Sequence, residues 1–404
     1  MRRLAVLSFH TSPLAQPGTG DGGGMNVYVR ELSAALSRAG VDCDVYTRAW
    51  RPGLPAVVDV EPGFRVHHVQ AGPERHLAID DLAELVPEFT DGVRRLLLEN
   101  GLPDLIHANY WLSGLSGHVL KHELELPLVS TFHTLARVKA ECDADHDGIR
   151  ARAEAEVIGC SDAILALSPD EALQLERLYQ AVPERVEIVP PGVDHRLFSP
   201  GDKAAARAEL GLGPGPVLLF VGRIQPLKGV DVALRALCKL DSPSATMLVV
   251  GGPSGPEGEA ELERLGKLVA DCGLQGRVRF DPPRRHDELT TYYRAADVCL
   301  VPSRSESFGL VALEAAACGT PVVAANVGGL ASLVDPGVTG FLVEGRDPAV
   351  YAGHVAWLLD QPEAARAMGL RAAARARGYR WSTTAGRLRR IYADLTSRTL
   401  VECS

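Results

Sequence analysis

Residues 298–330 read VCLVPSRSESFGLVALEAAACGTPVVAANVGGL. Short apolar runs at Val298–Val301 and Pro321–Ala324 have the length and composition of buried strands. A helical pattern lies between them and begins at Phe308–Leu310. Two strands joined by one helix form a parallel βαβ unit. This stretch therefore predicts an α/β fold built from doubly wound parallel sheets.

The same alternation of short strands and amphipathic helices runs along the rest of the 404 residues, a length that predicts two domains. The segment Val189–Asp202 contains three prolines and two glycines, so it is the predicted linker. We expect an N-terminal domain at 1–190, a second domain at 191–380, and a C-terminal helix at 381–404 that packs back on the first domain. The other expected strands are Leu4–Phe9, Val45–Arg48, Leu105–Ala108, Leu128–Phe132, Ala163–Ala166, Val217–Val221, Met247–Gly251 and Val278–Phe280.

The composition excludes several classes of protein. Apolar residues make up 46% of the chain and charged residues 23%, and no apolar stretch is long enough to insert into a membrane. A net charge of −9 gives no overall attraction to nucleic acid. The apolar run Leu4–Phe9 is too short for a signal peptide, so we expect a cytoplasmic protein. The eight cysteines form no C-x-x-C pair and no cluster with histidine, which predicts buried free thiols and no metal site.

A glycine-rich segment at Gln16–Gly40 reads QPGTGDGGGMNVYVRELSAALSRAG. Apolar residues recur at helical spacing from Met25, and Gly40 stands where a helix would end. Gly22, Gly23 and Gly24 therefore open a helix, where bare backbone N–H groups can bind phosphate or another anion.

Two alternatives apply to this loop. Gly18, Gly20 and Gly23 also match G-x-G-x-x-G, the fingerprint of a dinucleotide-binding dehydrogenase. That motif should follow its strand at once, whereas HTSPLAQP intervenes here. A purely structural glycine loop is the other alternative.

Charged residues follow two of the expected strands. In FVGRIQPLKG, Arg223 and Lys228 stand just past a strand end, where open α/β sheets bind ligands and where two cations can neutralise a diphosphate. In ESFGLVALEA, Glu306 precedes the predicted helix and Glu314 lies inside it, so their carboxylates can accept hydrogen bonds from sugar hydroxyls. The alternative for both pairs is a solvated surface position.

Taken together, these motifs resemble the family-4 retaining glycosyltransferases, and in particular the mycothiol-pathway branch that joins N-acetylglucosamine to inositol 3-phosphate. The resemblance implies the glycosyltransferase-B fold, with two Rossmann-like domains facing across a cleft. It also implies that the first domain binds the acceptor and the second binds the nucleotide sugar. The segments that carry it are HTSPLAQPGTGDGGGMNVY, HANYWLSG, HTLARVK, VGRIQPLKG, GGPSGP, YYRAAD, ESFGLVALEA and GTPVVAA.

The resemblance assigns roles to matching positions. Gly24, with Gly23, lies against the donor phosphate, Arg284 against the base, Glu306 against the sugar and Glu314 against the ribose. The implied catalytic residues are His133, Arg223, Lys228 and Glu306, and the remaining donor-binding residues are Ser307, Phe308, Gly309 and Leu310.

The acceptor positions match the family less well. Asn26, Tyr110 and Thr134 are retained, but Ile79 replaces a family lysine that helps hold the acceptor phosphate. Arg150 and Arg152 flank the place of a family arginine. The missing lysine favours a small unphosphorylated acceptor in specialised-metabolite (antibiotic) biosynthesis, with transfer from UDP-N-acetylglucosamine to inositol 3-phosphate as the alternative.

The family mechanism is front-face attack, in which the leaving diphosphate accepts the acceptor's proton. It needs no cofactor and no metal, and the D-x-D spelling at Asp143–Asp145 falls in a predicted loop. The expected partners are a UDP- or GDP-sugar and the small acceptor, without nucleic acid or membrane insertion, and a homodimer is left open. A sugar-nucleotide epimerase and a non-catalytic nucleotide-sugar binder are the alternatives from other classes.

Overall fold

The computed structural model describes the chain except residues 1, 19, 21, 142–147, 256 and 404, so Asp143–Asp145 lies outside the described residues. The chain divides into two compact units. Unit 1 comprises Met1–Ala15, Met25–Pro191 and Trp381–Ser404, and unit 2 comprises Gln16–Gly24 and Gly192–Arg380. The glycine loop therefore belongs to unit 2, which corrects the expected N-terminal domain at 1–190.

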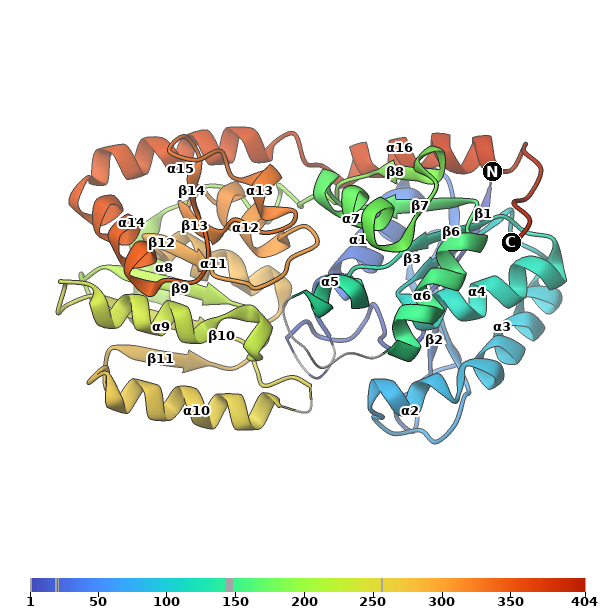
Figure 1. Cartoon of the computed structure of the whole chain (residues 1–404), viewed down its shortest axis with the longest axis horizontal. Coiled ribbons are helices and arrows are strands. Elements are labelled where there is room, and N and C mark those ends of the chain that lie inside the picture. The colour runs from blue at the N-terminus through green and yellow to red at the C-terminus, as the bar shows by residue number, and fades with distance from the viewer. Residues whose placement is uncertain (1, 19, 21, 142–147, 256, 404) are drawn as a thin grey trace. The chain divides into compact units, whose positions relative to one another are not determined.

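Unit 1 is built on one sheet, shown in Figure 1. Among its described residues eight strands have the order β3-β4-β2-β1-β5-β6-β7-β8, and all neighbours are parallel except β3 and β4. The strands are β1 (Arg3–Leu7), β2 (Asp42–Arg48), β3 (Val57–Glu61), β4 (Phe64–Val69), β5 (Leu105–Asn109), β6 (Leu128–Thr131), β7 (Ala163–Ala166) and β8 (Val186–Ile188).

Helices follow most of these strands, as the parallel pairing requires. They are α1 (Gly24–Arg38), α2 (Ile79–Ala83), α3 (Val86–Asn100), α4 (Trp111–Leu124), α5 (Ala136–Ala140), α6 (Gly148–Cys160), α7 (Pro169–Tyr179), the 3-10 turn η1 (Pro183–Arg185) and α16 (Trp381–Leu395). Helix α1 confirms the predicted helix after the glycine loop. Gly40 ends that segment with φ 84°, and its N–H donates to Ser37 O at 2.9 Å.

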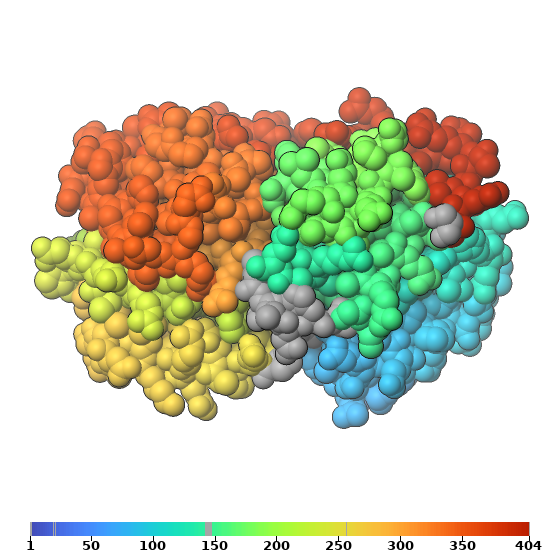
Figure 2. All heavy atoms as spheres, in the orientation of Figure 1, coloured from blue at the N-terminus to red at the C-terminus, as the bar shows by residue number. Residues whose placement is uncertain are grey.

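The last helix packs within unit 1. The Tyr392 hydroxyl of α16 makes a 2.8 Å hydrogen bond with His107 Nδ1 on β5, and Thr384 Oγ1 donates to Pro190 O at 2.8 Å. Figure 2 shows the residues that follow α16, in dark red, at the surface of unit 1.

Unit 2 contains a second sheet. In its described part, six strands pair in parallel in the order β11-β10-β9-β12-β13-β14. The strands are β9 (Val217–Val221), β10 (Thr246–Val250), β11 (Val278–Asp281), β12 (Val298–Val301), β13 (Val322–Ala325) and β14 (Gly340–Val343). The helices are α8 (Lys203–Glu209), η2 (Pro226–Lys228), α9 (Val230–Lys239), α10 (Gly258–Asp271), η3 (His286–Glu288), α11 (Leu289–Ala295), α12 (Leu310–Ala317), α13 (Leu330–Leu333), α14 (Pro348–Asp360) and α15 (Pro362–Ala376).

Each sheet is buried in its own apolar core. In unit 1, Phe9, Phe89 and Leu120 belong to one buried cluster, and in unit 2 Leu218 and Tyr351 belong to another. None of the described helices combines the length and the apolar composition that crossing a membrane requires.

The cysteines correct one expectation. Cys160, at the end of α6, is joined to Cys403 in a disulfide. The prediction of free thiols is therefore wrong for these two cysteines, which lie beside His118 and His122 of α4, residues far from them in the sequence. Burial of the remaining described thiols is confirmed for Cys43, Cys299 and Cys318, whereas Cys272 is partly exposed and Cys238 is exposed.

Candidate active site

In unit 2 the two predicted cations follow β9. Lys228 closes the turn η2, and its Nζ forms an ion pair with Glu306 Oε2 at 2.7 Å. Gly229 after it has φ 71°, and a Cβ there would lie 2.2 Å from Pro302 O, so only glycine fits this turn. The conformation of this turn therefore positions the Lys228 side chain beside Glu306, the predicted sugar-binding carboxylate.

The loop before α12 packs against the loop after β13 and is hydrogen-bonded to it. Gly329 N donates to Glu306 O at 3.0 Å. Gly309 has φ 100°, and a Cβ there would lie 2.6 Å from Leu330 Cδ2. Residues 306–310, which include the predicted contacts Ser307, Phe308 and Leu310, therefore have a fixed backbone at the start of α12.

The glycine loop packs on these same segments. Gln16 Nε2 donates to Pro283 O at 2.9 Å, and Ser254 Oγ donates to Gly20 O at 2.7 Å. A Cβ on Gly23 would lie 3.3 Å from Arg223 Nε, and a Cβ on Gly24 would lie 3.5 Å from Leu310 Cδ1. The structure thus brings the glycine loop, Arg223 and the start of α12 together in unit 2.

Glu314 lies inside unit 2 rather than on a solvated helix face. The residue is 4% exposed, and its carboxylate has Oε1 2.7 Å from His286 Nε2 and Oε2 accepting from the Tyr293 hydroxyl at 2.8 Å. Burial raises the pKa of Tyr293 well above its usual value, so this phenol stays a donor. Sequence reasoning missed both partners, although Tyr293 stands in the quoted segment YYRAAD.

Arg284, the predicted contact to the nucleobase, directly follows Pro283, whose carbonyl accepts a hydrogen bond from Gln16 of the glycine loop. It is half-buried, and its buried Nε has no hydrogen-bond partner among the residues that the structure describes. An unpaired buried donor is uncommon, and a bound ligand is one way to satisfy it.

His133 lies in unit 1, directly after β6. It adopts φ 62°, an uncommon conformation for a residue with a side chain, and its Nε2 is 2.9 Å from Asn109 Oδ1. Its ring meets Tyr28 edge-on at 4.9 Å between centroids. Burial, followed by the neighbouring His107 and His10, lowers the pKa of His133 to about 3, so the imidazole is neutral at physiological pH.

Three of the predicted acceptor residues come together in unit 1. The buried Arg150 donates from Nη2 to Thr134 O at 2.7 Å and to Thr134 Oγ1 at 3.0 Å. Its guanidinium carbon lies 4.9 Å above the Tyr110 ring, and its Nε donates to Glu154 Oε1 at 2.7 Å. Arg152 is exposed and donates from Nε to Gly148 O at 3.1 Å, so the two arginines lie in different surroundings.

The other two predicted acceptor residues have structural contacts. Ile79 begins α2 and packs against the apolar core of unit 1. Asn26 is buried, and its amide donates at 2.6 Å both to Thr11 Oγ1 and to Ser12 O. Both amide hydrogens of Asn26 therefore order the chain that leaves β1.

Comparison with known proteins assigns the family. Residues 23–192 match the family model of the glycosyl transferase 4-like domain, and residues 202–375 match that of glycosyl transferases group 1. The chain is 46% identical to the D-inositol 3-phosphate glycosyltransferase of Thermobispora bispora, over 98% of this chain and 96% of that protein. It is 48% identical to D-inositol 3-phosphate glycosyltransferase 2 of Catenulispora acidiphila, over 97% and 95%. This chain is a family-4 glycosyltransferase.

Solved structures agree with this family. Sucrose-phosphate synthase from Thermosynechococcus elongatus superposes with a TM-score of 0.92 at 35% identity, over 98% of this chain and 99% of that one. HepE from Anabaena, in complex with UDP-glucose, has a TM-score of 0.78 at 21% identity, over 98% and 100%, which shows the shared fold. The expected glycosyltransferase-B architecture of two α/β domains with parallel sheets is confirmed.

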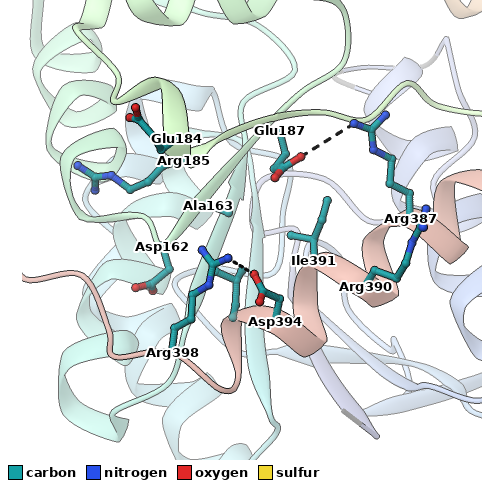
Figure 3. A pocket seen from close by; sticks show the side chains of 11 residues that line it. Asp162, Ala163, Glu184, Arg185, Glu187, Arg387, Arg390, Ile391, Asp394 and Arg398 are labelled. Atoms are coloured by element: carbon teal, nitrogen blue, oxygen red, sulfur yellow. Dashed lines mark ion pairs between the residues drawn. The ribbon is translucent and has the colours of Figure 1, made fainter.

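A cavity of about 400 Å³ lies elsewhere in this glycosyltransferase. Figure 3 shows it in unit 1, where Arg387 pairs with Glu187 and Arg398 with Asp394. Its lining is highly charged, with four arginines and four carboxylates, and it includes none of the predicted donor or acceptor residues. We therefore place the candidate site at the strand-end residues described above and not at this cavity.

Proposed function

We propose that this glycosyltransferase transfers N-acetylglucosamine from UDP-N-acetylglucosamine to D-inositol 3-phosphate with retention of configuration. Relatives named for that acceptor match almost the whole chain at 46% and 48% identity. They support the alternative raised from the sequence and give no support to an unphosphorylated acceptor from antibiotic biosynthesis.

Arg150 is the observation that carries the proposal. The missing lysine at position 79 argued against a phosphorylated acceptor, because a phosphate needs a cationic partner. Arg150 provides a buried cation beside Thr134 and over Tyr110, two of the expected acceptor contacts. Glu154 and Thr134 fix the orientation of this guanidinium through its Nε and Nη2, a planar cation of this kind suits phosphate, and Ile79 then serves only to pack the core.

On the donor side, unit 2 would bind UDP-N-acetylglucosamine. Arg223 and Lys228 would stabilise the negative charge that grows on the leaving diphosphate, as preorganised cations do in other enzymes. Glu306 is held by Lys228 at 2.7 Å and would accept hydrogen bonds from the sugar hydroxyls. We assign no metal to this step, since these two cations would neutralise the diphosphate.

His133 would act as a neutral group near the reacting carbon. Its lowered pKa leaves no positive charge to stabilise an anion. The imidazole can still donate or accept one hydrogen bond, and Asn109 orients it. The proton lost by the acceptor hydroxyl would pass to the leaving diphosphate.

Steady-state kinetics with UDP-N-acetylglucosamine test the acceptor directly. Charge-assisted hydrogen bonds contribute about 1.5 to 3 kcal/mol each, so two bonds to phosphate predict a kcat/KM on the order of 10² to 10⁴ higher for D-inositol 3-phosphate than for myo-inositol. Equal or better turnover of myo-inositol would overturn the proposal. Release of UDP only when acceptor is present separates transfer from epimerisation, and binding without turnover would indicate a non-catalytic protein.

A further inference from the structure

Four side chains that belong to none of the sites above converge on one point at the surface of unit 1. They are His118 and His122 of α4, Cys160 at the end of α6, and Cys403 after α16. One ligand atom from each lies within 4.8 Å of all the others. We propose that the reduced chain binds one Zn²⁺ ion through these two thiolates and two imidazoles.

The spacing fits a tetrahedral zinc site. With Zn–S near 2.3 Å and Zn–N near 2.0 Å, the ligand atoms would be roughly 3.3 to 3.8 Å apart. His122 Nε2 already lies 2.9 Å from Cys403 Sγ, and His118 Nε2 lies 3.7 Å from the same sulfur. Once the Cys160–Cys403 disulfide is reduced, small side-chain rotations would open the cluster to the size of the ion.

A disulfide between the two cysteines does not explain why two histidines lie beside it. They are four residues apart on α4, so both rings lie on one helix face, with centroids 5.1 Å apart. A bond between Cys160 and Cys403 needs neither ring. An N₂S₂ set with a tetrahedral arrangement is the set that zinc prefers.

A carboxylate orients one of these rings from behind. His118 Nδ1 lies 3.2 Å from Glu156 Oε1 on α6, while Nε2 faces the sulfur. Zinc-binding histidines regularly donate their second ring nitrogen to such a carboxylate, which fixes the tautomer. Glu156 therefore completes the arrangement expected around a zinc ligand.

The C-terminal segment is held in place without the sulfur atoms. The buried Asp162 accepts from Val401 N at 2.7 Å and from Leu128 N at 2.7 Å. The buried Lys121 pairs with Asp162 at 2.9 Å and donates to Cys160 O at 2.7 Å. This network of hydrogen bonds positions Cys403 next to α4 without help from the disulfide.

All four positions on the ion would be filled by protein, which indicates a structural site with no open coordination position for a substrate. Binding replaces two thiol protons by one Zn²⁺, and the two protons are released to solvent. The disulfide between Cys160 and Cys403 must first be reduced, taking two electrons and two protons from a thiol or phosphine reductant, and zinc binding itself then changes no oxidation state. The site would tie α4, α6 and the C-terminal segment together.

The test uses the full chain, purified under a thiol-free reductant, with Zn²⁺ as the probe. We expect about one zinc per chain by elemental analysis, and a thiolate-to-cobalt charge-transfer band when Co²⁺ replaces it. His122→Ala should weaken zinc binding at least 100-fold while leaving both thiols available, and Cys238→Ser, which removes an exposed cysteine elsewhere, should change nothing. Glu156→Gln should weaken binding about 10- to 100-fold.

Three results would overturn the proposal. One is a reduced chain that takes up no stoichiometric zinc. Another is a zinc content that His118→Ala and His122→Ala leave unchanged. The third is a Cys160–Cys403 disulfide, seen by thiol titration and mass, that persists under the reductant and excludes metal. Each is measured without the glycosyl-transfer assay, so failure here is separate from failure of the proposed function.

Discussion

At the scale of single residues, substitution of Lys228 has the largest expected effect on turnover. We predict that Lys228→Ala lowers kcat by about 10²- to 10³-fold, the usual loss when one stabiliser of developing charge is removed. Thermal stability should change little, because the ion pair with Glu306 is partly exposed at both partners. Lys239→Ala, at an exposed lysine on α9, is the matched control. Near-normal turnover in Lys228→Ala would remove the residue from the mechanism.

The two glutamates of the α12 segment should respond differently to loss of charge. Glu314 is buried and bound to His286 and Tyr293, so Glu314→Gln should lower the free energy of unfolding by about 1 to 3 kcal/mol. Glu306 is partly exposed, so Glu306→Gln should keep the stability and weaken binding of the sugar nucleotide more than that of UDP. Denaturant melts and calorimetry with both ligands measure this, and equal stability losses in the two variants would contradict it.

The positions of the predicted donor-site residues followed from the sequence more directly than those of the predicted acceptor residues. Gly23 and Gly24 stand at the start of α1 and Arg223 stands just after β9, so the ends of predicted elements place all three. The acceptor prediction could not separate Arg150 from Arg152, which lie about 200° apart around a helix. Which of them faces inward depends on Glu154 and Thr134, partners that no local pattern identifies.

At the scale of elements, most of the strands that the sequence predicted are buried in the interior of a sheet. All ten expected strands are confirmed within a few residues, and nine of them lie between other strands of their sheet, whereas β11 lies at an edge. The missed strands are β3, β4, β8 and β14. Strand β3 is a partly exposed antiparallel edge, β8 spans only Val186–Ile188, and β14 begins at a glycine, whereas β4 lies inside the sheet but has polar residues among its apolar ones. Edge strands are covered on fewer sides and carry a weaker apolar signal.

Helix α16 is fixed to the sheet of unit 1 by one buried hydrogen bond that can be tested. Tyr392→Phe leaves His107 Nδ1, which is fully buried, without its partner, so we predict a loss of about 1 to 3 kcal/mol in unfolding free energy. Tyr351 is the matched control. It is equally buried, but its hydroxyl has no partner within the described part of the chain, so Tyr351→Phe should be neutral or stabilising. Equal losses in both variants would contradict the assigned bond.

At the scale of the whole molecule, buried titratable groups of unit 1 set opposing pH dependences. Burial lowers the pKa of His107 to about 3, as it does for His133, so both bind protons more readily after unfolding and their contribution to stability is lost as pH falls below about 6.5. Burial has the opposite consequence for Glu171, whose pKa rises to about 7 from 4.5. Its contribution is present at low pH and is lost as pH rises through about 7.

Between about pH 4.5 and 6.5 the two histidines outweigh the one carboxyl, so we predict that the free energy of unfolding rises with pH in this window. Glu171→Gln removes the contribution of this carboxyl to the pH dependence of stability, because the amide stays neutral and its oxygen can still accept from Leu167 N. Relative to the wild type, this variant should gain on the order of 3 kcal/mol between pH 4.5 and pH 7. Urea unfolding at several pH values measures the gain, with Glu176→Gln on the exposed face of α7 as control. A stability difference that does not change with pH would show that Glu171 is ionised in the folded protein.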